Sequence, residues 1–423
     1  METFVERAIL VGVQTQGDEH FAYSMEELGN LAEAIDVEVV GELTQNLERP
    51  NPSHYVGGGK VEEIRRFYET ANANLVIFND ELSPTQIRNL ENGLACKVID
   101  RTMLILDIFA RRARTKEARM QVDLAQLQYM LPRLVGLRAS LSRQGGGTGG
   151  GFKNKGAGET KLELDRRIIE DQIAKLRREL AHMEGQRETQ RKRRKRSGLP
   201  VVSLVGYTNA GKSTLLNRLL EKVEAQEEKQ VFEKDMLFAT LDTSVRKVKL
   251  PDNKAFLLTD TVGFVSKLPH HLVKAFRSTL EEARDADLLL QVVDVSHKEH
   301  RFMMDVTNET LVDVGVENIP TIYVLNKADQ TTIPYPTVKG NQIWLSAKTG
   351  EGVDELVEVI KKAVFASYIT CKVFIPFERG EIVSYLNEFA NVKSVKYEED
   401  GTLMTVEMLE TDRKKYEQYV VSY

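Results

Sequence analysis

The chain has 423 residues, 42% of them hydrophobic, which is enough material for two to four domains with a sizeable core. No apolar run approaches the roughly 20 residues of a membrane span, and the N-terminus METFVERAIL does not have the pattern of a secretion signal. The two cysteines, Cys96 and Cys371, lie outside any zinc pattern, and this sparse use of cysteine indicates a reducing cytoplasm. The net charge of −5 is uneven, because residues 101–200 hold 24 Lys and Arg against 11 Asp and Glu, a balance of +13 that favours a polyanionic partner.

Residues 1–114 are predicted to form an N-terminal α/β domain. Short apolar runs alternate there with helical patterns, which is typical of a largely parallel sheet. We expect a helix over residues 24–35, begun by a Ser24 cap with Glu27 at its third position, and another helix that begins at Ser83-Pro84. The expected strands are residues 8–13, 37–41, 75–78 and 96–99.

A glycine loop within this domain, Tyr55-Val56-Gly57-Gly58-Gly59-Lys60, runs into a helical pattern. A loop of this kind is able to bind an anion or phosphate at the helix N-terminus. It lacks the spacing of a Walker phosphate loop, however, and a plain tight turn explains the pattern equally well.

Residues 115–197 are predicted to form an antiparallel helical hairpin. Two apolar stripes of similar length, over residues 115–134 and 161–185, have the spacing of amphipathic helices whose seams pack together. The positions of the first stripe are Met120, Leu124, Leu127, Leu131 and Leu134. The positions of the second are Leu162, Ile169, Leu176 and Met183, with Ile173 and Leu180 beside them.

A glycine-rich segment, QGGGTGGGFKNKGAGET at residues 144–160, joins the two helices. It cannot bury a core, and its backbone entropy is high when it is free. A flexible linker is the simple interpretation. Linkers usually connect domains, however, whereas this segment caps a hairpin, and a basic, glycine-rich tip can approach RNA phosphates closely.

The hairpin ends in RETQRKRRKR, residues 187–196, with seven basic residues in ten. The run is either a solvated helix end or a surface that neutralises phosphates, and we favour contact with RNA. No aromatic RNP pattern is present, so recognition would depend on shape and charge. The candidates for RNA contact in the tip and the run are Arg143, Lys153, Lys155, Arg191, Lys192, Arg193, Arg194, Lys195 and Arg196.

The stretch VVSLVGYTNAGKSTLLNRLL, residues 201–220, has the pattern of a strand, a phosphate loop and a helix. It fits G-x-x-x-x-G-K-[S/T], in which backbone N–H groups and the helix N-terminus surround a polyphosphate. Lys212 would contact the β and γ phosphates, and the Ser213 hydroxyl would ligate Mg²⁺. The predicted phosphate-binding residues are Gly206, Tyr207, Thr208, Asn209, Ala210, Gly211, Lys212, Ser213 and Thr214.

A second motif, Asp260-Thr261-Val262-Gly263, follows the apolar run Phe256-Leu257-Leu258. The carboxyl end of a strand is where open α/β sheets place their ligands. We expect Asp260 to hold the Mg²⁺ shell and the Gly263 N–H to contact the γ phosphate.

Two more motifs point to guanine. In Asn326-Lys327-Ala328-Asp329, the Asp329 carboxylate can accept from both N1–H and the N2 amino group of guanine, and adenine offers neither donor on that edge. A buried polar group left without its partner costs about 1–3 kcal/mol, so the choice of base is strong. Ser346-Ala347-Lys348 follows another strand-like run and would present a backbone N–H to guanine O6. In this order the four motifs resemble the Ras-like, translation-factor-related class of GTPases.

The end of the chain is predicted to hold the last helix of the GTPase domain, at residues 353–365, and then a small α+β domain. That domain would have a strand at 373–376, a helix at 380–389 and a hairpin turn at Asp400-Gly401. Packing and partner docking are equally open roles for it.

Four segments carry a closer resemblance: TKEARMQVDLAQLQYMLPRL, GAGETKLELDRR, VIFNDELSP and YVGGGKVEEI, with a GTPase domain after them, look like the HflX family of bacterial GTPases over residues 1–365. The resemblance implies cytoplasmic GTP hydrolysis coupled to binding of the large (50S) ribosomal subunit. It also implies a role in dissociating stalled or stressed ribosomes, with the hairpin tip near ribosomal RNA. The domains are then residues 1–114, 115–197, 198–366 and 367–423.

The segment Phe238-Ala239-Thr240-Leu241-Asp242 matches the family's FATLD pattern. Thr240 and Thr243 are both candidates for the switch hydroxyl that ligates Mg²⁺ when the γ phosphate is present, and the resemblance selects Thr240. Thr240 therefore joins Lys212 and Gly263 as a predicted catalytic residue, and the whole segment is predicted to line the nucleotide.

The residue after Gly263 is Phe264, where Ras-like enzymes with a catalytic glutamine have their water-positioning amide. A phenylalanine ring cannot orient water, so hydrolysis by the chain alone should be slow and stimulated by the ribosome. Asn209 resembles the position at which related GTPases bind K⁺, which can replace the charge of an arginine. A K⁺ ion is thus a second candidate cofactor beside Mg²⁺.

We therefore expect a GTP- and GDP-binding protein that acts on ribosomes, as a monomer or weak oligomer in the cytoplasm, with peripheral membrane association left open. One alternative is a ribosome-assembly or RNA-associated GTPase that splits nothing. Another is a regulatory GTP switch whose hairpin binds a protein or membrane partner. Binding of ATP by the N-terminal domain finds no support in a second Walker motif.

Overall fold

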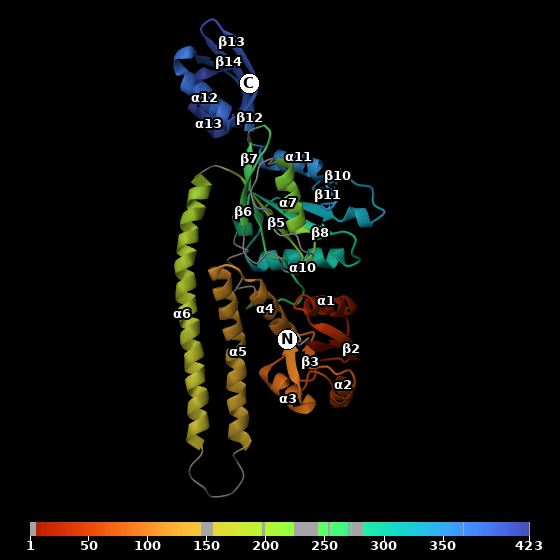
Figure 1. Cartoon of the computed structure of the whole chain (residues 1–423). Helices are drawn as coiled ribbons and strands as arrows, with labels where there is room; N and C mark the ends of the chain where they lie inside the picture. The colour runs from red at the N-terminus through yellow and green to blue at the C-terminus, as the bar shows by residue number, and fades with distance from the viewer. Residues whose placement is uncertain are drawn as a thin grey trace, which may run out of the picture. The chain divides into compact units, whose positions relative to one another are not determined.

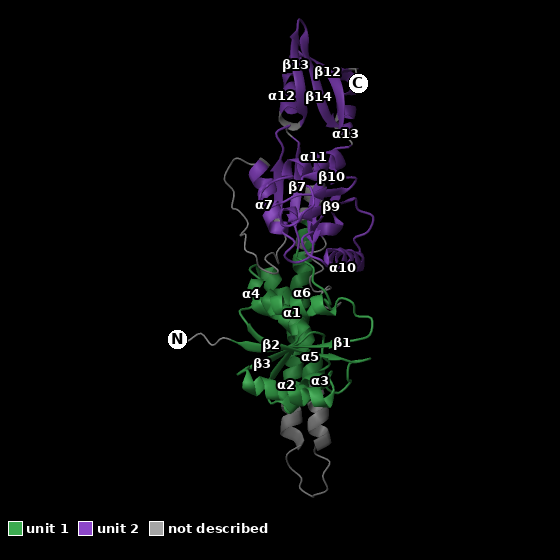
Figure 2. Cartoon of the chain, turned by 90° about the vertical axis from the view of Figure 1, so that its right-hand side faces the viewer, with its two compact units in different colours: residues 1–192, 234–242, 262–280 green, residues 193–233, 243–261, 281–423 purple. Residues whose placement is uncertain are grey.

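The structure is a computed structural model that describes residues 6–144, 155–196, 199–223, 244–252, 254–269, 272, 282–366 and 368–422. It divides into two compact units (Figure 2). Unit 1 is Met1–Lys192, Lys234–Asp242 and Val262–Leu280, and unit 2 is Arg193–Glu233, Thr243–Thr261 and Glu281–Tyr423. The division places a short segment of the predicted GTPase domain, Val262–Leu280, with the N-terminal part of the chain.

Unit 1 contains the predicted parallel sheet, with strand order β2-β1-β3-β4. Alternate residues of β1 face opposite sides: Ala8 and Leu10 pack toward α1 and α4, and Ile9 and Val11 pack toward α2 and α3. Both faces are thus buried, as a parallel sheet requires. The elements are β1 (Arg7–Gln14), α1 (Phe21–Glu33), β2 (Glu38–Asn46), α2 (Gly58–Thr70), β3 (Leu75–Phe78), α3 (Pro84–Leu94), β4 (Lys97–Asp100) and α4 (Arg101–Arg112).

The two helix starts predicted in this domain have different outcomes. The helix predicted to begin at Ser83-Pro84 is confirmed as α3, and Ser83 caps it in a capping box completed by Gln86. The Ser24 cap is wrong, because α1 begins at Phe21 and Ser24 lies inside the helix. Its hydroxyl is buried and exchanges hydrogen bonds with the side chain of Asn79, at 2.9 and 3.2 Å. A distant partner therefore explains this serine, and no local cap is needed.

The predicted hairpin is confirmed as α5 (Lys116–Gln144) and α6 (Lys155–Arg196), which lie side by side in Figure 1. Glu117 at the start of α5 pairs with Arg187 near the end of α6, at 2.9 Å, so the helices are antiparallel. Ile173 in the predicted seam of α6 is buried. Among the described residues, no helix combines the length and apolar character that a bilayer crossing demands.

Unit 2 contains a sheet of order β10-β11-β9-β8-β5-β7-β6, in which the strands from β11 to β7 are parallel and the two edge strands antiparallel. This is the predicted Ras-like arrangement, and the strand before the phosphate loop, β5, lies inside the sheet between β8 and β7. The elements are β5 (Val201–Gly206), α7 (Lys212–Val223), β6 (Ser244–Lys249), β7 (Ala255–Asp260), β8 (Leu288–Asp294), α10 (His300–Asp313), β9 (Thr321–Asn326), η1 (Ala328–Gln330), β10 (Thr337–Lys339), β11 (Gln342–Trp344) and α11 (Val353–Val364).

The C-terminal residues form the predicted small α+β domain, whose sheet has the order β13-β14-β12-β15. The predicted hairpin is present, but its turn lies one residue earlier than expected: Glu399 and Asp400 connect the strands, and Gly401 is the first residue of β14, where it pairs with Glu398. Lys254, which precedes β7, donates to Glu407 of β14 at 2.8 Å and ties this domain to the GTPase sheet. The elements are β12 (Tyr368–Pro376), η2 (Phe377–Arg379), α12 (Gly380–Phe389), β13 (Asn391–Glu398), β14 (Gly401–Leu409), α13 (Glu410–Lys415), η3 (Glu417–Tyr419) and β15 (Val420–Ser422).

Candidate functional site

The loop between β5 and α7 has a backbone that two glycines make possible. Gly206 has a φ of +145° and Gly211 a φ of +92°, conformations that residues with a Cβ rarely adopt. A Cβ at Gly206 would overlap the carbonyl of Val292 in β8, and one at Gly211 would overlap the side-chain amide of Asn326. The loop therefore lies directly against the neighbouring strand and against the base-recognition motif.

Lys212 is the first residue of α7, and its side chain is buried under the loop. Its Nζ donates to the carbonyl of Gly206 at 2.9 Å and to that of Tyr207 at 2.7 Å. Burial lowers the pKa of this ammonium to about 8, and the nearby Asp260 carboxylate opposes part of that shift. An anionic ligand would strongly stabilise the charged form of this buried lysine, because its present hydrogen-bond partners are neutral carbonyls.

Oxygen ligands meet beside this lysine. The Ser213 hydroxyl donates to Asp260 Oδ2 at 3.3 Å, and Asp260, the last residue of β7, is completely buried. The next residue, Thr261, is fixed by a bond from its hydroxyl to the carbonyl of Leu204 at 2.7 Å. One hydroxyl and one carboxylate fit Mg²⁺, which usually takes one or two protein oxygens and completes its shell with water and phosphate.

Asn326 connects two of the predicted motifs. Its Nδ2 donates to the carbonyl of Ala210 in the phosphate loop at 2.8 Å, and its Oδ1 accepts from the N–H of Ala347 at 2.9 Å. All these groups are buried. The side chain that the sequence assigns to the base therefore holds the phosphate loop and the Ser346-Ala347-Lys348 loop in a fixed relation.

Asp329 offers an acceptor without a partner. Its Oδ1 is buried and makes no hydrogen bond within the described part of the chain. Two residues before it, Lys327 takes a left-handed conformation with φ of 61°, and its Nζ pairs with Asp294 Oδ2 at 2.7 Å. An orphaned buried carboxylate oxygen suits the N1–H and N2 donors of guanine, because the penalty of leaving it unpaired is about 1–3 kcal/mol.

Two residues of this site were missed by the sequence analysis. Asp294, the partner of Lys327, closes β8 at the same edge of the sheet, and its position at a strand end is a signal that could have found it. Arg218 in α7 donates from Nε to the carbonyl of Ala347 at 3.1 Å and from Nη2 to that of Lys348 at 3.0 Å. A single arginine on a helix carries no comparable signal.

Some predicted site residues lie elsewhere. Val262 and Gly263 follow Thr261 directly, but they fall in unit 1, where they are buried. The segment Phe238-Ala239-Thr240-Leu241-Asp242 lies outside the described residues, as does Lys153. The other candidates for RNA contact lie in α5 or α6, and their side chains are outside the description; they are Arg143, Lys155, Arg191, Lys192, Arg193, Arg194, Lys195 and Arg196.

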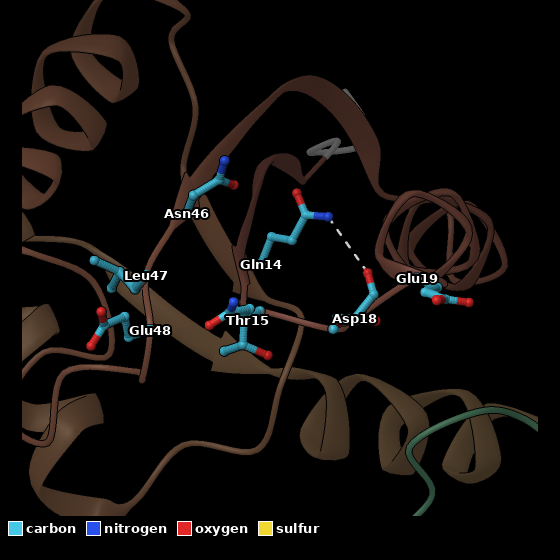
Figure 3. Close-up of a pocket in the computed structure, with 9 residues that line it drawn as sticks. Gln14, Thr15, Asp18, Glu19, Asn46, Leu47 and Glu48 are labelled. Carbon is cyan, nitrogen blue, oxygen red and sulfur yellow. Dashed lines mark hydrogen bonds between the residues drawn. The ribbon is translucent and has the colours of Figure 1, made fainter.

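The glycine loop of the N-terminal domain has none of this geometry. The N–H of Gly57 is already bound to Gln45 Oε1 at 2.9 Å, and Lys60 pairs with Glu63 at 2.8 Å. A cavity of about 630 Å³ does lie nearby, at the carboxyl ends of β1 and β2 (Figure 3). Its lining holds three carboxylates and no Lys or Arg, so its charge opposes a phosphate; the residues are Gln14, Thr15, Gln16, Gly17, Asp18, Glu19, Asn46, Leu47 and Glu48.

Four family models match consecutive parts of the chain. The model described as "GTP-binding GTPase N-terminal" matches residues 22–110, and "GTP-binding GTPase Middle Region" matches residues 112–194. The model described as "50S ribosome-binding GTPase" matches residues 201–327, and "HflX C-terminal domain" matches residues 336–420. The third match contains the phosphate loop, Asp260 and Asn326.

Individual relatives cover nearly the whole chain. GTPase HflX of Caldanaerobacter subterraneus subsp. tengcongensis is 45% identical and covers 99% of this chain and 94% of its own length. GTPase HflX of Escherichia coli (strain K12) is 39% identical, with 94% of this chain and 92% of its own covered. Among solved structures, a GTP-binding protein from Sulfolobus solfataricus in complex with GDP is 23% identical, covers 86% of this chain and 99% of its own, and has a TM-score of 0.43.

Proposed function

The chain belongs to the HflX family of GTPases and hydrolyses GTP, and from that premise we propose that it binds the large (50S) ribosomal subunit and separates stalled 70S ribosomes. The observation that carries the proposal is the match of its GTPase domain to a model described as "50S ribosome-binding GTPase". The balance of +13 over residues 101–200 supports a partner made of RNA.

The proposed nucleotide contacts follow from the site. Lys212 leaves the carbonyls of its own loop and binds the β and γ phosphates, with the loop N–H groups around them. The free oxygen of Asp329 accepts from guanine, and the N–H of Ala347, held close by Asn326, lies in the loop proposed to contact guanine O6. The Gly263 N–H senses the γ phosphate.

Ser213, Asp260 and the switch residue Thr240 would hold Mg²⁺, which offsets the negative charge that develops on the phosphates during transfer. In this proposal the Thr240 and Gly263 segments are ordered while the γ phosphate is present and released after hydrolysis. The large subunit binds the ordered form.

Hydrolysis by the chain alone is proposed to be slow. Phe264 follows Gly263, at the position in the sequence where a water-positioning amide would otherwise stand, and its ring cannot orient a water molecule. Its side chain is 2% exposed. An arginine finger or an equivalent group contributes about 10³–10⁵ in rate, so a partner is able to supply most of the turnover. GTP hydrolysis measured with and without purified 50S subunits tests this directly.

K⁺ is a second proposed cofactor. Asn209 lies exposed in the phosphate loop with a φ of +60°, a conformation that asparagine tolerates better than most residues. A K⁺ ion beside it would supply the positive charge of an arginine finger. Equal GTPase rates in K⁺ and Na⁺ buffers would eliminate this role.

The decisive experiment for ribosome splitting is a sucrose gradient of 70S ribosomes after incubation with the chain. With GTP we expect more free 30S and 50S subunits, and with GDP or with Lys212→Met we expect none. If the chain with GTP binds 50S but leaves the 70S peak intact, the alternative of a ribosome-assembly or RNA-associated GTPase replaces the proposal.

A regulatory switch that binds a protein or membrane partner is the remaining alternative. Reversal of the charges of residues 191–196 separates it from the proposal, because phosphate neutralisation supplies most nonspecific affinity for RNA. We expect the reversed chain to lose 50S binding and to keep the slow GTPase activity that it has without ribosomes. Unchanged 50S binding would instead support a role of this run toward another partner.

A further inference from the structure

The segment that follows Thr261 packs within unit 1, although the motif that begins it belongs to the nucleotide site. Residues 262–269 and 272 of this segment are described, and we call them the switch segment. Val262, Val265 and Leu272 are buried in the same apolar cluster as Ile105 of α4 and Val122 of α5. The cluster that builds the N-terminal domain therefore includes this piece of the GTPase motif.

The switch segment contacts the N-terminal sheet at a particular place. From β1 the chain passes through α1 to β2 on one side, and then through α2 to β3 on the other side of β1. The order therefore reverses between β1 and β3, and doubly wound sheets bind their ligands outside the carboxyl ends of the strands at such a point. Asn79 and Asp80 directly follow β3 there. Asp80 binds Lys267 of the switch segment directly. Asn79 is connected to the segment through Arg101, which binds both Asn79 and Ser266.

The link through Asn79 is a buried polar network around Arg101, the first residue of α4. The guanidinium donates to Asn79 Oδ1 at 2.9 Å, to the carbonyl of Ser266 at 3.3 Å and to the hydroxyl of Ser266 at 2.9 Å. Glu27 of α1 binds both the guanidinium and the Ser266 hydroxyl. Arg101 is 1% exposed, so this charge is neutralised and hydrogen-bonded entirely inside the unit.

The link through Asp80 is an ion pair at the edge of that network. Lys267 Nζ lies 2.7 Å from Asp80 Oδ1, and the hydroxyl of Tyr55 binds the other oxygen of the same carboxylate. Lys267 has a φ of +54°, which is uncommon for a residue with a long side chain. Such a conformation persists where its surroundings fix it, so the contacts on both sides determine this backbone.

We propose that the N-terminal domain uses its ligand-binding edge to hold the switch segment, with Arg101 and Asp80 as positioning residues that make the site discriminate GTP from GDP. The inference rests on the proposed contact of the Gly263 N–H with the γ phosphate. Gly263 lies three residues before Ser266, so the backbone that carries this N–H is fixed close to an anchored residue. The N-terminal domain thus positions the backbone N–H that recognises the terminal phosphate.

The discrimination follows from preorganisation. A free segment must lose backbone entropy when it orders around the γ phosphate, whereas an anchored segment has lost most of that entropy on folding. GDP has no γ phosphate, so GDP binding does not require the switch segment to be ordered. Weakening the anchor therefore lowers the affinity for GTP and leaves the affinity for GDP unchanged.

The experiment compares single variants of the full-length chain by calorimetry with GDP and with β,γ-imido-GTP in Mg²⁺ buffer. Lys267→Asp places a second carboxylate beside Asp80, and aspartate tolerates the left-handed backbone. Lys267→Arg keeps the ion pair. Lys97→Asp is the matched control, because Lys97 forms a surface ion pair with Glu6 in the same unit at 3.1 Å and lies outside the network.

We expect Lys267→Asp to weaken the binding of β,γ-imido-GTP about threefold to fivefold, as partly exposed ion pairs allow. Lys267→Arg and Lys97→Asp should match the wild type, and GDP affinity should stay constant throughout. Ser266→Ala removes a hydroxyl bound to two charged side chains, and the selective loss should reach about tenfold. Hydrogen exchange of the amides at 262–268 should accelerate in both weakened variants.

Three results would overturn the inference: equal losses for both nucleotides, which would mark a purely structural role; an Arg variant as defective as the Asp variant; or unchanged affinities. Gly263→Ala separates this failure from failure of the underlying contact. If Gly263→Ala weakens the binding of β,γ-imido-GTP while Lys267→Asp and Ser266→Ala do not, the proposed role of the N-terminal domain is disproved and the γ-phosphate contact stands. If Gly263→Ala has no effect, both are disproved.

Discussion

Two loops of this chain contain glycines and a lysine and lead into a helix, yet their backbones differ. In the loop from Gly206 to Lys212, both glycines have positive φ and lie against neighbouring groups that leave no room for a Cβ. In the loop from Tyr55 to Lys60, the described glycines have ordinary φ, and a Cβ at Gly58 or Gly59 would meet nothing within 4 Å. The number of glycines is therefore a poor guide to a phosphate site.

The lysines of the two loops differ in the same sense. Lys212 is buried and bound to two carbonyls, which are neutral partners that a phosphate is able to replace. Lys60 lies beside the carboxylate of Glu63 at 2.8 Å, on the first turns of α2. A phosphate that approached Lys60 would have to compete with a negative charge already in place, so the comparison favours one nucleotide site in the described chain.

The largest expected effect comes from the lysines. Lys212→Met keeps much of the side-chain volume but removes the cation, and each hydrogen bond from a charged donor contributes about 1.5–3 kcal/mol. We expect GTP and GDP affinity to fall about 100-fold. Lys60→Met should leave both affinities within about twofold. Calorimetry with each nucleotide measures the difference, and a comparable loss from Lys60→Met would break the comparison.

The glycines should give the next largest effect. Gly211→Ala forces a Cβ into a left-handed backbone and against the amide of Asn326, at a cost of about 2 kcal/mol. GDP affinity should fall on the order of 30-fold. Gly58→Ala is the matched control in the other loop, and its affinity should be that of the wild type. Circular dichroism of both variants shows whether the fold is retained, and wild-type affinity in Gly211→Ala would refute the steric argument.

The loops also differ in how much of each was visible in the sequence. The strand, loop and helix around Gly206 and Lys212 are predictable from the sequence, because strand, glycine spacing, lysine and helix follow one another within residues 201–220. The Tyr55–Lys60 loop was left open, because its sequence does not tell a positive φ from an ordinary one. Local patterns likewise predicted α3, the hairpin helices and the C-terminal hairpin.

Contacts between distant residues were beyond the sequence. Ser24 and Glu27 have the spacing of a capping box, but both side chains are used inside the unit, and the bond from Arg101 to Ser266 spans 165 residues. Nothing in a linear pattern reports that Arg101 is buried or that α4 meets the switch segment. Arg218 was missed for the same reason, since its partners lie about 130 residues away.

A smaller effect concerns pH. Burial holds the pKa of Lys212 at about 8, and bound phosphates would raise it again. Above pH 8 the free site has lost its proton, so GDP binding must take one up and weakens as the pH rises. Between pH 7 and 8.5 we expect an affinity loss of about fourfold. Magnesium-free calorimetry in two buffers of different ionisation enthalpy detects the proton. Lys212→Met should show no proton uptake on GDP binding. Proton release by the wild type would contradict the assignment of this uptake to Lys212.

The smallest effect should come from Gly59, and it has the opposite sign. Gly59 lies in α2 with an ordinary φ and open space at its Cβ position, so alanine restricts the unfolded chain without straining the folded one. Gly59→Ala should stabilise α2 by about 0.5–1 kcal/mol, measured by native-state hydrogen exchange of its amides. GTP binding should not change. Destabilisation, or altered nucleotide binding, would mean that this loop needs its glycines after all, because only a close ligand or an unusual backbone would make a methyl group there unfavourable.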